Sequence, residues 1–69
     1  MNKNAAIVIG NDNIVKLNYD IYYYPNNITE YELMKEIIDL NKFYDKIYCL
    51  GEWPVHIRKE KIKSWIIGL

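Results

Sequence analysis

The sequence has a single cysteine, Cys49, so one copy of the chain cannot form an internal disulfide. Small secreted domains usually carry several disulfides, because a chain this short buries only about 60% of the surface that its unfolded form exposes. The absence of such cross-links favours a reducing compartment. We therefore expect a cytoplasmic protein, located in the host cytoplasm if its source is a virus.

Long hydrophobic runs are also missing. Only five apolar residues, 5–9, stand between the N-terminal polar residues and Gly10. A membrane-spanning helix needs about 20 such residues, and a signal-peptide core is longer than five as well. With glycine and proline scarce and about half of the residues apolar, the composition is that of a globular protein. We expect a single compact domain over residues 1–69 and no membrane association.

Neither sign of charge is in excess, because nine basic residues balance nine acidic ones. This balance removes any attraction of the whole protein to nucleic acid. Cations nevertheless gather in the segment 56–65, with tryptophans close by, and such a pattern can bind phosphates and stack on bases. A small nucleic-acid-binding protein is therefore the alternative function. The residues of this predicted site are Arg58, Lys59, Lys61, Lys63 and Trp65.

Arginine is scarce too, with one residue against eight lysines, whereas Ile, Asn, Lys and Tyr fill about half of the chain. Codons for these abundant residues are rich in A and T, which indicates an AT-rich genome. AT-rich bacterial hosts, their phages, plasmids and archaeal viruses all fit this bias. We predict a small phage, viral or mobile-element protein that modulates host machinery, for example as an inhibitor of host defence.

Two segments near the N-terminus have the patterns of strands. Residues 5–9 are apolar on both faces, and residues 15–24 alternate strictly between two sets of side chains. Period-two alternation is typical of a half-buried antiparallel strand. Because residues 10–13 have turn chemistry, we expect the two segments to form a β-hairpin. The 5–9 strand would then offer an open edge for pairing with a partner.

The alternation assigns the tyrosines to two faces. Tyr19 and Tyr23 share the apolar face and are expected in the core, whereas Tyr22 and Tyr24 fall on the polar face and are expected to be exposed. Exposed rings are either strand formers on a half-solvated sheet or a platform for a partner, since Tyr and Trp are enriched in interface hot spots. The predicted protein-binding residues are Tyr22, Tyr24, Tyr31 and Trp53.

A helix start follows the strands. Thr29 and Glu32 have the spacing of a capping box, which predicts a helix over 30–42. The apolar residues that recur at helical spacing, and that are expected to pack across the hairpin, are Leu33, Met34, Ile37, Ile38, Leu40 and Tyr44. The next segment, 47–50, has the pattern of a strand. An extended stretch is expected over 53–57. Residues 58–69 have the patterns of both a helix and a strand, and we favour the helix.

The predicted order of elements is β-β-α-β-(β)-α. It implies an α+β fold in which one main helix covers a small antiparallel or mixed sheet.

Few residues indicate catalysis. Cys49 and His56 are seven residues apart, but they would provide only two metal ligands, or a nucleophile and base with no orienting third group. We interpret Cys49 as a buried, unreactive thiol. Glu32 and Glu36 lie one turn apart on a solvated helix face and do not form a catalytic pair. We expect no enzymatic activity, metal or cofactor.

The leading hypothesis is therefore a non-enzymatic interaction module. It would bind a protein partner through exposed aromatic side chains and a sheet edge, and a homodimer is one form that this hypothesis allows.

Overall fold

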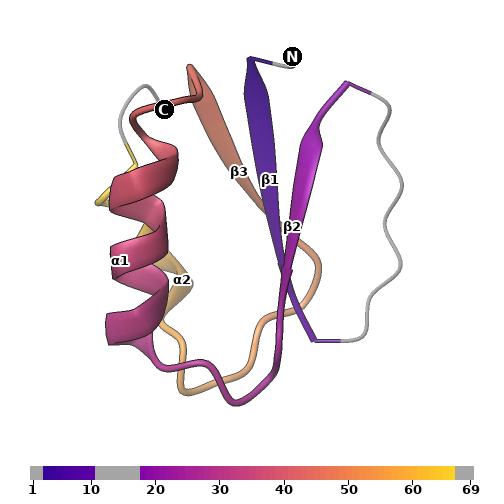
Figure 1. Ribbon diagram of the computed structural model, residues 1–69. Helices are drawn as coiled ribbons and strands as arrows, with labels where there is room; N and C mark the ends of the chain where they lie inside the picture. Colours follow the sequence, from indigo (N-terminus) through magenta and orange to yellow (C-terminus); the bar gives the residue numbers. More distant parts are fainter. Residues whose placement is uncertain (1–2, 11–17, 67–69) are drawn as a thin grey trace.

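A computed structural model describes residues 3–10 and 18–66. Helices and strands occupy most of this part of the chain (Figure 1). In chain order they are β1 (Asn4–Ile9), β2 (Asp20–Tyr24), α1 (Glu30–Leu40), β3 (Lys46–Leu50) and α2 (Lys59–Lys63). The predicted main helix and the predicted strand over 47–50 are confirmed close to their expected bounds.

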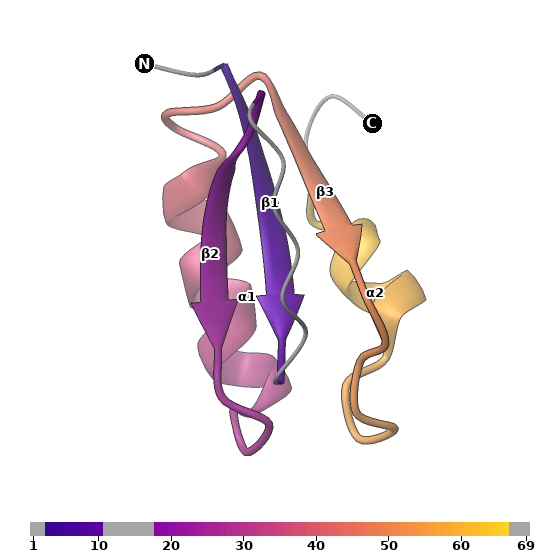
Figure 2. The same ribbon diagram turned by 90° about the vertical axis from the view of Figure 1, so that its right-hand side faces the viewer.

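The three strands form one parallel sheet in the order β2–β1–β3. Figure 2 shows them side by side and pointing the same way. The predicted β-hairpin is therefore wrong, and so is the antiparallel or mixed sheet. Alternation indicates that a strand is half-buried, but it does not fix the direction of its neighbour. Only Asp20–Tyr24 of the alternating segment 15–24 belongs to β2, and residues 15–17 lie outside the described residues.

β1 is the central strand, and Ala5 to Ile9 are all buried. Strands of parallel sheets are commonly buried on both faces and have continuous apolar sequences. The apolar run 5–9 has this character, so the prediction that it forms an open edge is wrong. The edge strands of the described sheet are β2 and β3.

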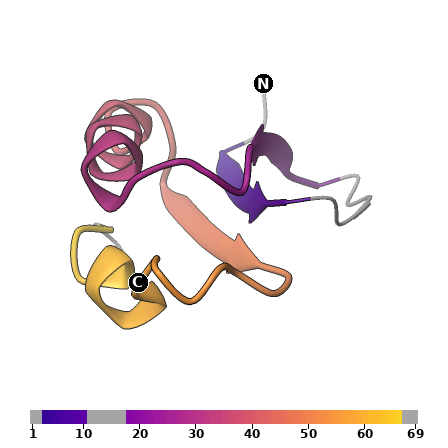
Figure 3. The ribbon, with the colours of Figure 1, turned by 90° about the horizontal axis from the view of Figure 1, so that it is seen from below.

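Both helices pack on the same face of the sheet (Figure 3). The register places Ala5, Ile7 and Ile9 of β1 on this face, where they join the buried residues of α1 and α2 in one cluster. The other members of the cluster are Ile28, Leu33, Ile37, Leu40, Ile47, Ile57, Ile62 and Ile66. The even-numbered tyrosines of β2 lie in register with Ile7 and Ile9 and also contact this cluster.

This register corrects the predicted faces of β2. Tyr22 and Tyr24, which were expected to be exposed, are partly buried against the core, whereas Tyr23, which was expected inside, is 53% exposed. Tyr19 is partly buried beside Tyr48, with the ring centroids 5.1 Å apart. The alternation separated the two faces correctly. It did not identify the buried one, because a tyrosine ring is apolar even where its hydroxyl is polar.

Local signals explain where α1 begins. The Thr29 hydroxyl accepts from the Glu32 backbone N–H at 3.1 Å, and the Glu32 carboxylate accepts from the Thr29 N–H at 3.1 Å, so the predicted capping box is present. Leu33, Ile37 and Leu40 then face the sheet. α1 has 11 residues, and within the described residues no helix is long and apolar enough to cross a membrane.

The chain after β3 differs in part from expectation. Residues 53–57 do not form the extended segment that their alternation predicted, because residues 54–57 make a turn in which the Ile57 N–H donates to the Pro54 carbonyl at 3.0 Å. Proline at 54 fixes its own φ and favours this turn. The helical option for the C-terminal segment is confirmed over Lys59–Lys63, although α2 is short. Residues 64–66, which follow α2, are not helical, and residues 67–69 lie outside the described residues.

We predict that Thr29→Ala lowers the free energy of unfolding by about 1 kcal/mol, because it removes one half of the capping box. Urea unfolding followed by circular dichroism measures this change. Val55→Ala is the matched control, since Val55 is fully exposed outside the helices. An equal effect of the two substitutions would contradict a stabilising role of the cap.

Candidate protein-binding surface

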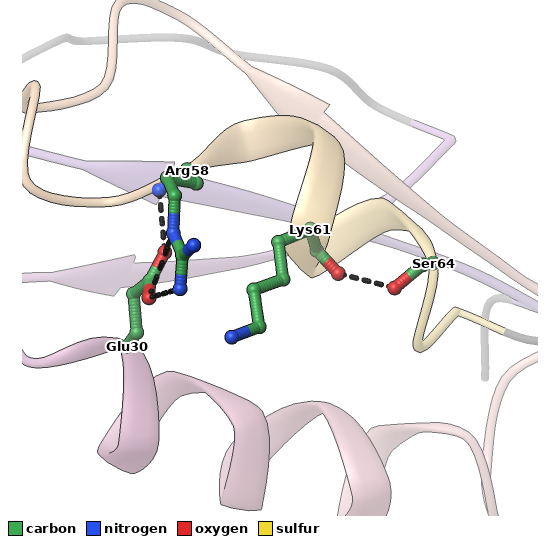
Figure 4. A network of polar contacts seen from close by, with 4 residues as sticks. All are labelled: Glu30, Arg58, Lys61 and Ser64. Atoms are coloured by element: carbon green, nitrogen blue, oxygen red, sulfur yellow. Dashed lines mark hydrogen bonds and ion pairs between the residues drawn. The ribbon is translucent and has the colours of Figure 1, made fainter.

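An ion pair joins the beginnings of the two helices. The Arg58 guanidinium donates to both oxygens of the Glu30 carboxylate, at 2.9 and 3.1 Å, and the Arg58 backbone N–H donates to it at 2.7 Å (Figure 4). These side-chain and backbone hydrogen bonds lower the pKa of Glu30 to about 2, and the carboxylate raises the pKa of Arg58. This Glu30–Arg58 ion pair, which we call the clamp, fixes the start of α2 beside the start of α1.

A second contact joins the other ends of the helices. The side-chain amide of Asn41, the C-cap of α1, donates to the Trp65 carbonyl at 2.9 Å. Trp65 follows α2, and its own N–H donates to the Ile62 carbonyl at 3.0 Å. The two helices are therefore held together at both ends and run in the same direction.

A groove of about 500 Å³ lies beside this second contact and is lined by Met34, Ile38, Asn41, Lys42 and Trp65. We call it the α1–Trp65 groove. Its walls are mainly apolar, and ammonium groups lie at its margin. Lys42 belongs to the lining, and the amine of Lys61 is 5.8 Å from the Trp65 ring.

Exposed apolar side chains continue the groove onto the surface of α1. Ile38 is 49% exposed and Tyr31, seven residues earlier on the same side of the helix, is 64% exposed. Phe43, shortly after the helix, is 67% exposed. Large apolar side chains that are exposed close to a groove are typical of an interaction site.

The four predicted protein-binding residues do not form one surface. Tyr31 is exposed on α1, whereas Tyr22 and Tyr24 contact the core on the inner face of the sheet. Trp53 is partly buried after β3, where its indole N–H donates to the Leu50 carbonyl at 3.0 Å. Of these four, Tyr31 is the residue that shares the outward side of α1 with the groove.

Tyr22 belongs to a chain of hydrogen bonds with Tyr44 and Asp20. Tyr44 donates to the Asp20 carboxylate at 2.7 Å, so the Tyr22 hydroxyl must donate to the Tyr44 oxygen, at 2.5 Å. The hydrogen bond with Tyr22, burial and the hydrogen bond to Asp20 raise the pKa of Tyr44 above its usual 10. Burial, and secondarily the charge of Glu36, raises the pKa of Tyr24 to about 12. The hydroxyls of Tyr24 and Tyr44 are therefore neutral at physiological pH. The hydrogen bonds that join Tyr22, Tyr44 and Asp20 connect β2 to the chain that follows α1.

The basic segment also makes contacts inside the fold. The Lys59 amine lies 5.4 Å from the Trp53 ring and donates to the Gly51 carbonyl at 3.1 Å. Lys61 lies over Trp65, and Lys63 is 3.8 Å from the Glu60 carboxylate. Arg58 forms the clamp with Glu30. Stacking of bases on either tryptophan would compete with these contacts and with packing against the core.

Cys49 and His56, the two residues considered as a catalytic or metal-binding pair, take part in the packing and hydrogen bonding of the fold. Burial raises the pKa of the Cys49 thiol to about 11, so little thiolate is present at neutral pH. The Nε2–H of His56 donates to the Ile28 carbonyl at 2.8 Å, since a carbonyl can only accept. In residues 3–10 and 18–66, no cluster of three or more His, Cys, Asp or Glu side chains has the geometry to hold a metal ion.

The two acids considered as a catalytic pair lie on α1 in a shallow polar depression of about 270 Å³, together with Lys35 and Asp39. Glu32 is part of the capping box, and its hydrogen bonds with the Thr29 backbone and side chain lower its pKa. Glu36 lies one turn further along the exposed face. A charged surface of this kind is typical of a solvated helix.

Sequence reasoning missed the groove because it assigned Met34 and Ile38 to the core together with Leu33, Ile37 and Leu40. Successive helical residues are rotated by about 100°, so these five positions span an arc too wide for one sheet-facing stripe. In the structure Leu33, Ile37 and Leu40 are buried, whereas Met34 and Ile38 lie outside the core. The width of the apolar arc is the signal that would have identified an additional apolar surface.

We predict that Tyr44→Phe destabilises the fold by roughly 1 kcal/mol, because it removes the hydroxyl that links Tyr22 to Asp20. Chemical denaturation measures the difference. Tyr31→Phe removes a hydroxyl from the exposed ring on α1 and is expected to change stability by much less. Similar losses for the two variants would show that the chain of tyrosines contributes nothing specific.

The Glu30–Arg58 clamp predicts that the stability of the fold depends on pH in the acidic range. The pKa of Glu30 in the folded chain, about 2, lies below its usual value of 4.5, so the clamp stabilises the fold above pH 4.5. This contribution is lost as the pH falls from 4.5 to 2. Wild type should therefore lose more stability than Glu30→Gln over this range, as measured by urea midpoints. Asp39→Asn, which alters an exposed pair with Lys42, should leave most of the wild-type pH dependence in place.

Comparison with known proteins completes the description of this surface. No protein-family model, curated protein or solved structure matches the chain. The groove, its exposed apolar margin and the surrounding charges are thus the features from which a function can be inferred.

Proposed function

We propose that this chain is a non-enzymatic interaction module that binds a protein partner through the α1–Trp65 groove. The observation that supports this function is the groove itself, an apolar concavity of about 500 Å³ whose lining includes the half-exposed side chain of Ile38. Tyr31 is exposed on the same side of α1. Burial of such a surface against a partner releases water from apolar groups, which is the main driving force of protein association.

The shape of the groove favours recognition by a folded or helical segment. Trp65 forms one wall and the apolar side of α1 forms the other, and the Asn41–Trp65 hydrogen bond holds the two walls together. A groove whose walls are already in place loses little conformational entropy on binding. Aromatic side chains at the centre of an interface contribute much of its binding energy.

The cations near the groove favour one orientation of the bound partner. Lys42 lines the groove and Lys61 lies beside Trp65, so a partner with carboxylates next to its apolar anchor is favoured over one with basic residues there. Pairing of a partner with an edge strand, β2 or β3, stays a prediction. The role as a phage, viral or mobile-element modulator of host machinery also stays a prediction, because it rests on composition.

A capture experiment tests the proposed function. Ile38→Asp places a carboxylate in the groove, and Val55→Asp introduces the same change at an exposed position that does not line it. We expect proteins captured from host cells by the wild type to be lost with Ile38→Asp and retained with Val55→Asp, as measured by quantitative mass spectrometry. Circular dichroism checks that both variants are folded.

Two results would contradict the proposal. One is equal capture by the two Asp variants. The other is retention on single-stranded DNA that decreases with salt and disappears in Lys59→Glu/Lys61→Glu, which would favour the nucleic-acid alternative.

A further inference from the structure

The outward side of α1 has a sequence pattern that is complementary to itself. Tyr31, Met34, Ile38 and Asn41 follow one another at spacings of three, four and three residues, which are the spacings of the contact positions in a pair of packed helices. Three of these four side chains carry large apolar groups. Met34, Ile38 and Asn41 also line the α1–Trp65 groove, so the seam and the groove are continuous.

Charged residues beside this seam alternate in sign. Glu32, Lys35, Asp39 and Lys42 are exposed and have the same spacings of three, four and three residues. Read in one direction the order is negative, positive, negative, positive, and in the opposite direction every sign is reversed. Two copies of α1 that pack antiparallel, with Lys35 of one opposite Asp39 of the other, therefore also place Lys42 opposite Glu32. A parallel pair in register would place like charges together.

We propose that the partner bound at the α1–Trp65 groove is a second copy of this chain, with the two α1 helices antiparallel about a two-fold axis. This inference rests on the proposed function and names its partner. The two-fold axis makes each contact occur twice, as in other isologous dimers. In this arrangement Ile38 of one copy lies near Met34 of the other and enters its groove.

The contacts within one copy leave Lys35, Asp39 and Lys42 available, whereas the Glu32 carboxylate already accepts from Thr29 in the capping box. The Asp39–Lys42 pair is 3.8 Å apart with both side chains 67% exposed, so it is a weak surface interaction. The Lys35 amine lies 5.0 Å from the Tyr31 ring, also at the surface. The nine basic and nine acidic residues give a net charge of zero, so two copies do not repel each other as wholes.

The size of the contact sets its expected strength. A helix of 11 residues is about 16 Å long, so the seam buries less than the roughly 800 Å² per partner of a standard stable interface. We therefore expect a reversible dimer that forms at micromolar to millimolar concentrations and exchanges rapidly. Electrostatic pairs beside the seam would determine the direction of packing more than its affinity.

Sedimentation equilibrium from about 10 µM to about 1 mM tests the inference, with a range chosen for a weak interface. The average mass of the wild type should rise from the monomer value of 8.3 kDa towards twice that value. Ile38→Asp should remain monomeric, and the matched Val55→Asp should associate like the wild type. Circular dichroism establishes that each variant is folded.

Charge reversal tests the antiparallel geometry. Lys35→Asp opposes two acids, and Asp39→Lys opposes two lysines, so each variant alone should dimerise at least about 10-fold more weakly than the wild type. When the two variants are mixed in equal amounts, opposite charges face each other again and association should return. Simple loss of structure in either variant would not be repaired by mixing.

Several outcomes would overturn the inference. A wild type that stays monomeric at 1 mM excludes the second copy as the partner, and a mixture of the two charge variants that does not associate excludes the antiparallel seam. The proposed function has a separate test, because capture of another protein by the wild type and Val55→Asp, but not by Ile38→Asp, would support the groove with a different occupant.

Discussion

Burial of the central strand β1 on both faces is the constraint on which the rest of the structure depends. Ala5 to Ile9 are at most 1% exposed, and hydrogen-bonded neighbours lie on both sides of the strand. Such a strand needs cover, and α1 and α2 provide it together on one face (Figure 3). The groove lies where the C-terminal part of α1 meets Trp65, just after α2. The candidate binding surface therefore follows from the way in which the core is closed.

The fold could be predicted from the sequence where the signals are local. Thr29 and Glu32 identified the start of α1, and the recurrence of apolar residues identified the helix, although it did not separate the buried Leu33, Ile37 and Leu40 from the residues of the groove. The direction of the strands is not a local property, because it depends on where the chain returns to the sheet. Nearness in sequence favoured a hairpin between 5–9 and 15–24. The doubly apolar character of 5–9 was the better guide, since it is typical of the centre of a parallel sheet.

The candidate site was less predictable, because tyrosines on a strand and large aliphatic residues on a helix can lie either in the core or on the surface. A tyrosine has an apolar ring and a polar end, so the period of two in β2 could not decide whether Tyr22 or Tyr23 faces the core. The Tyr22–Tyr44–Asp20 hydrogen bonds, which satisfy the buried hydroxyls, join residues about 20 positions apart. Isoleucine and methionine on a helix are equally ambiguous. Ile37 is buried and Ile38 is half exposed, although they are neighbours in the chain.

The polar contacts at the two ends of the helix pair explain how a small apolar surface can remain ordered. The Glu30–Arg58 clamp holds the starts of α1 and α2 together, and the Asn41–Trp65 hydrogen bond holds their ends. Neither contact uses an apolar side chain of the groove, so Met34 and Ile38 stay available to a partner. Because the walls of the groove are fixed before binding, little of the gain from burying them is lost to ordering the chain. A short helix can thus support the core with one side and recognise a partner with the other.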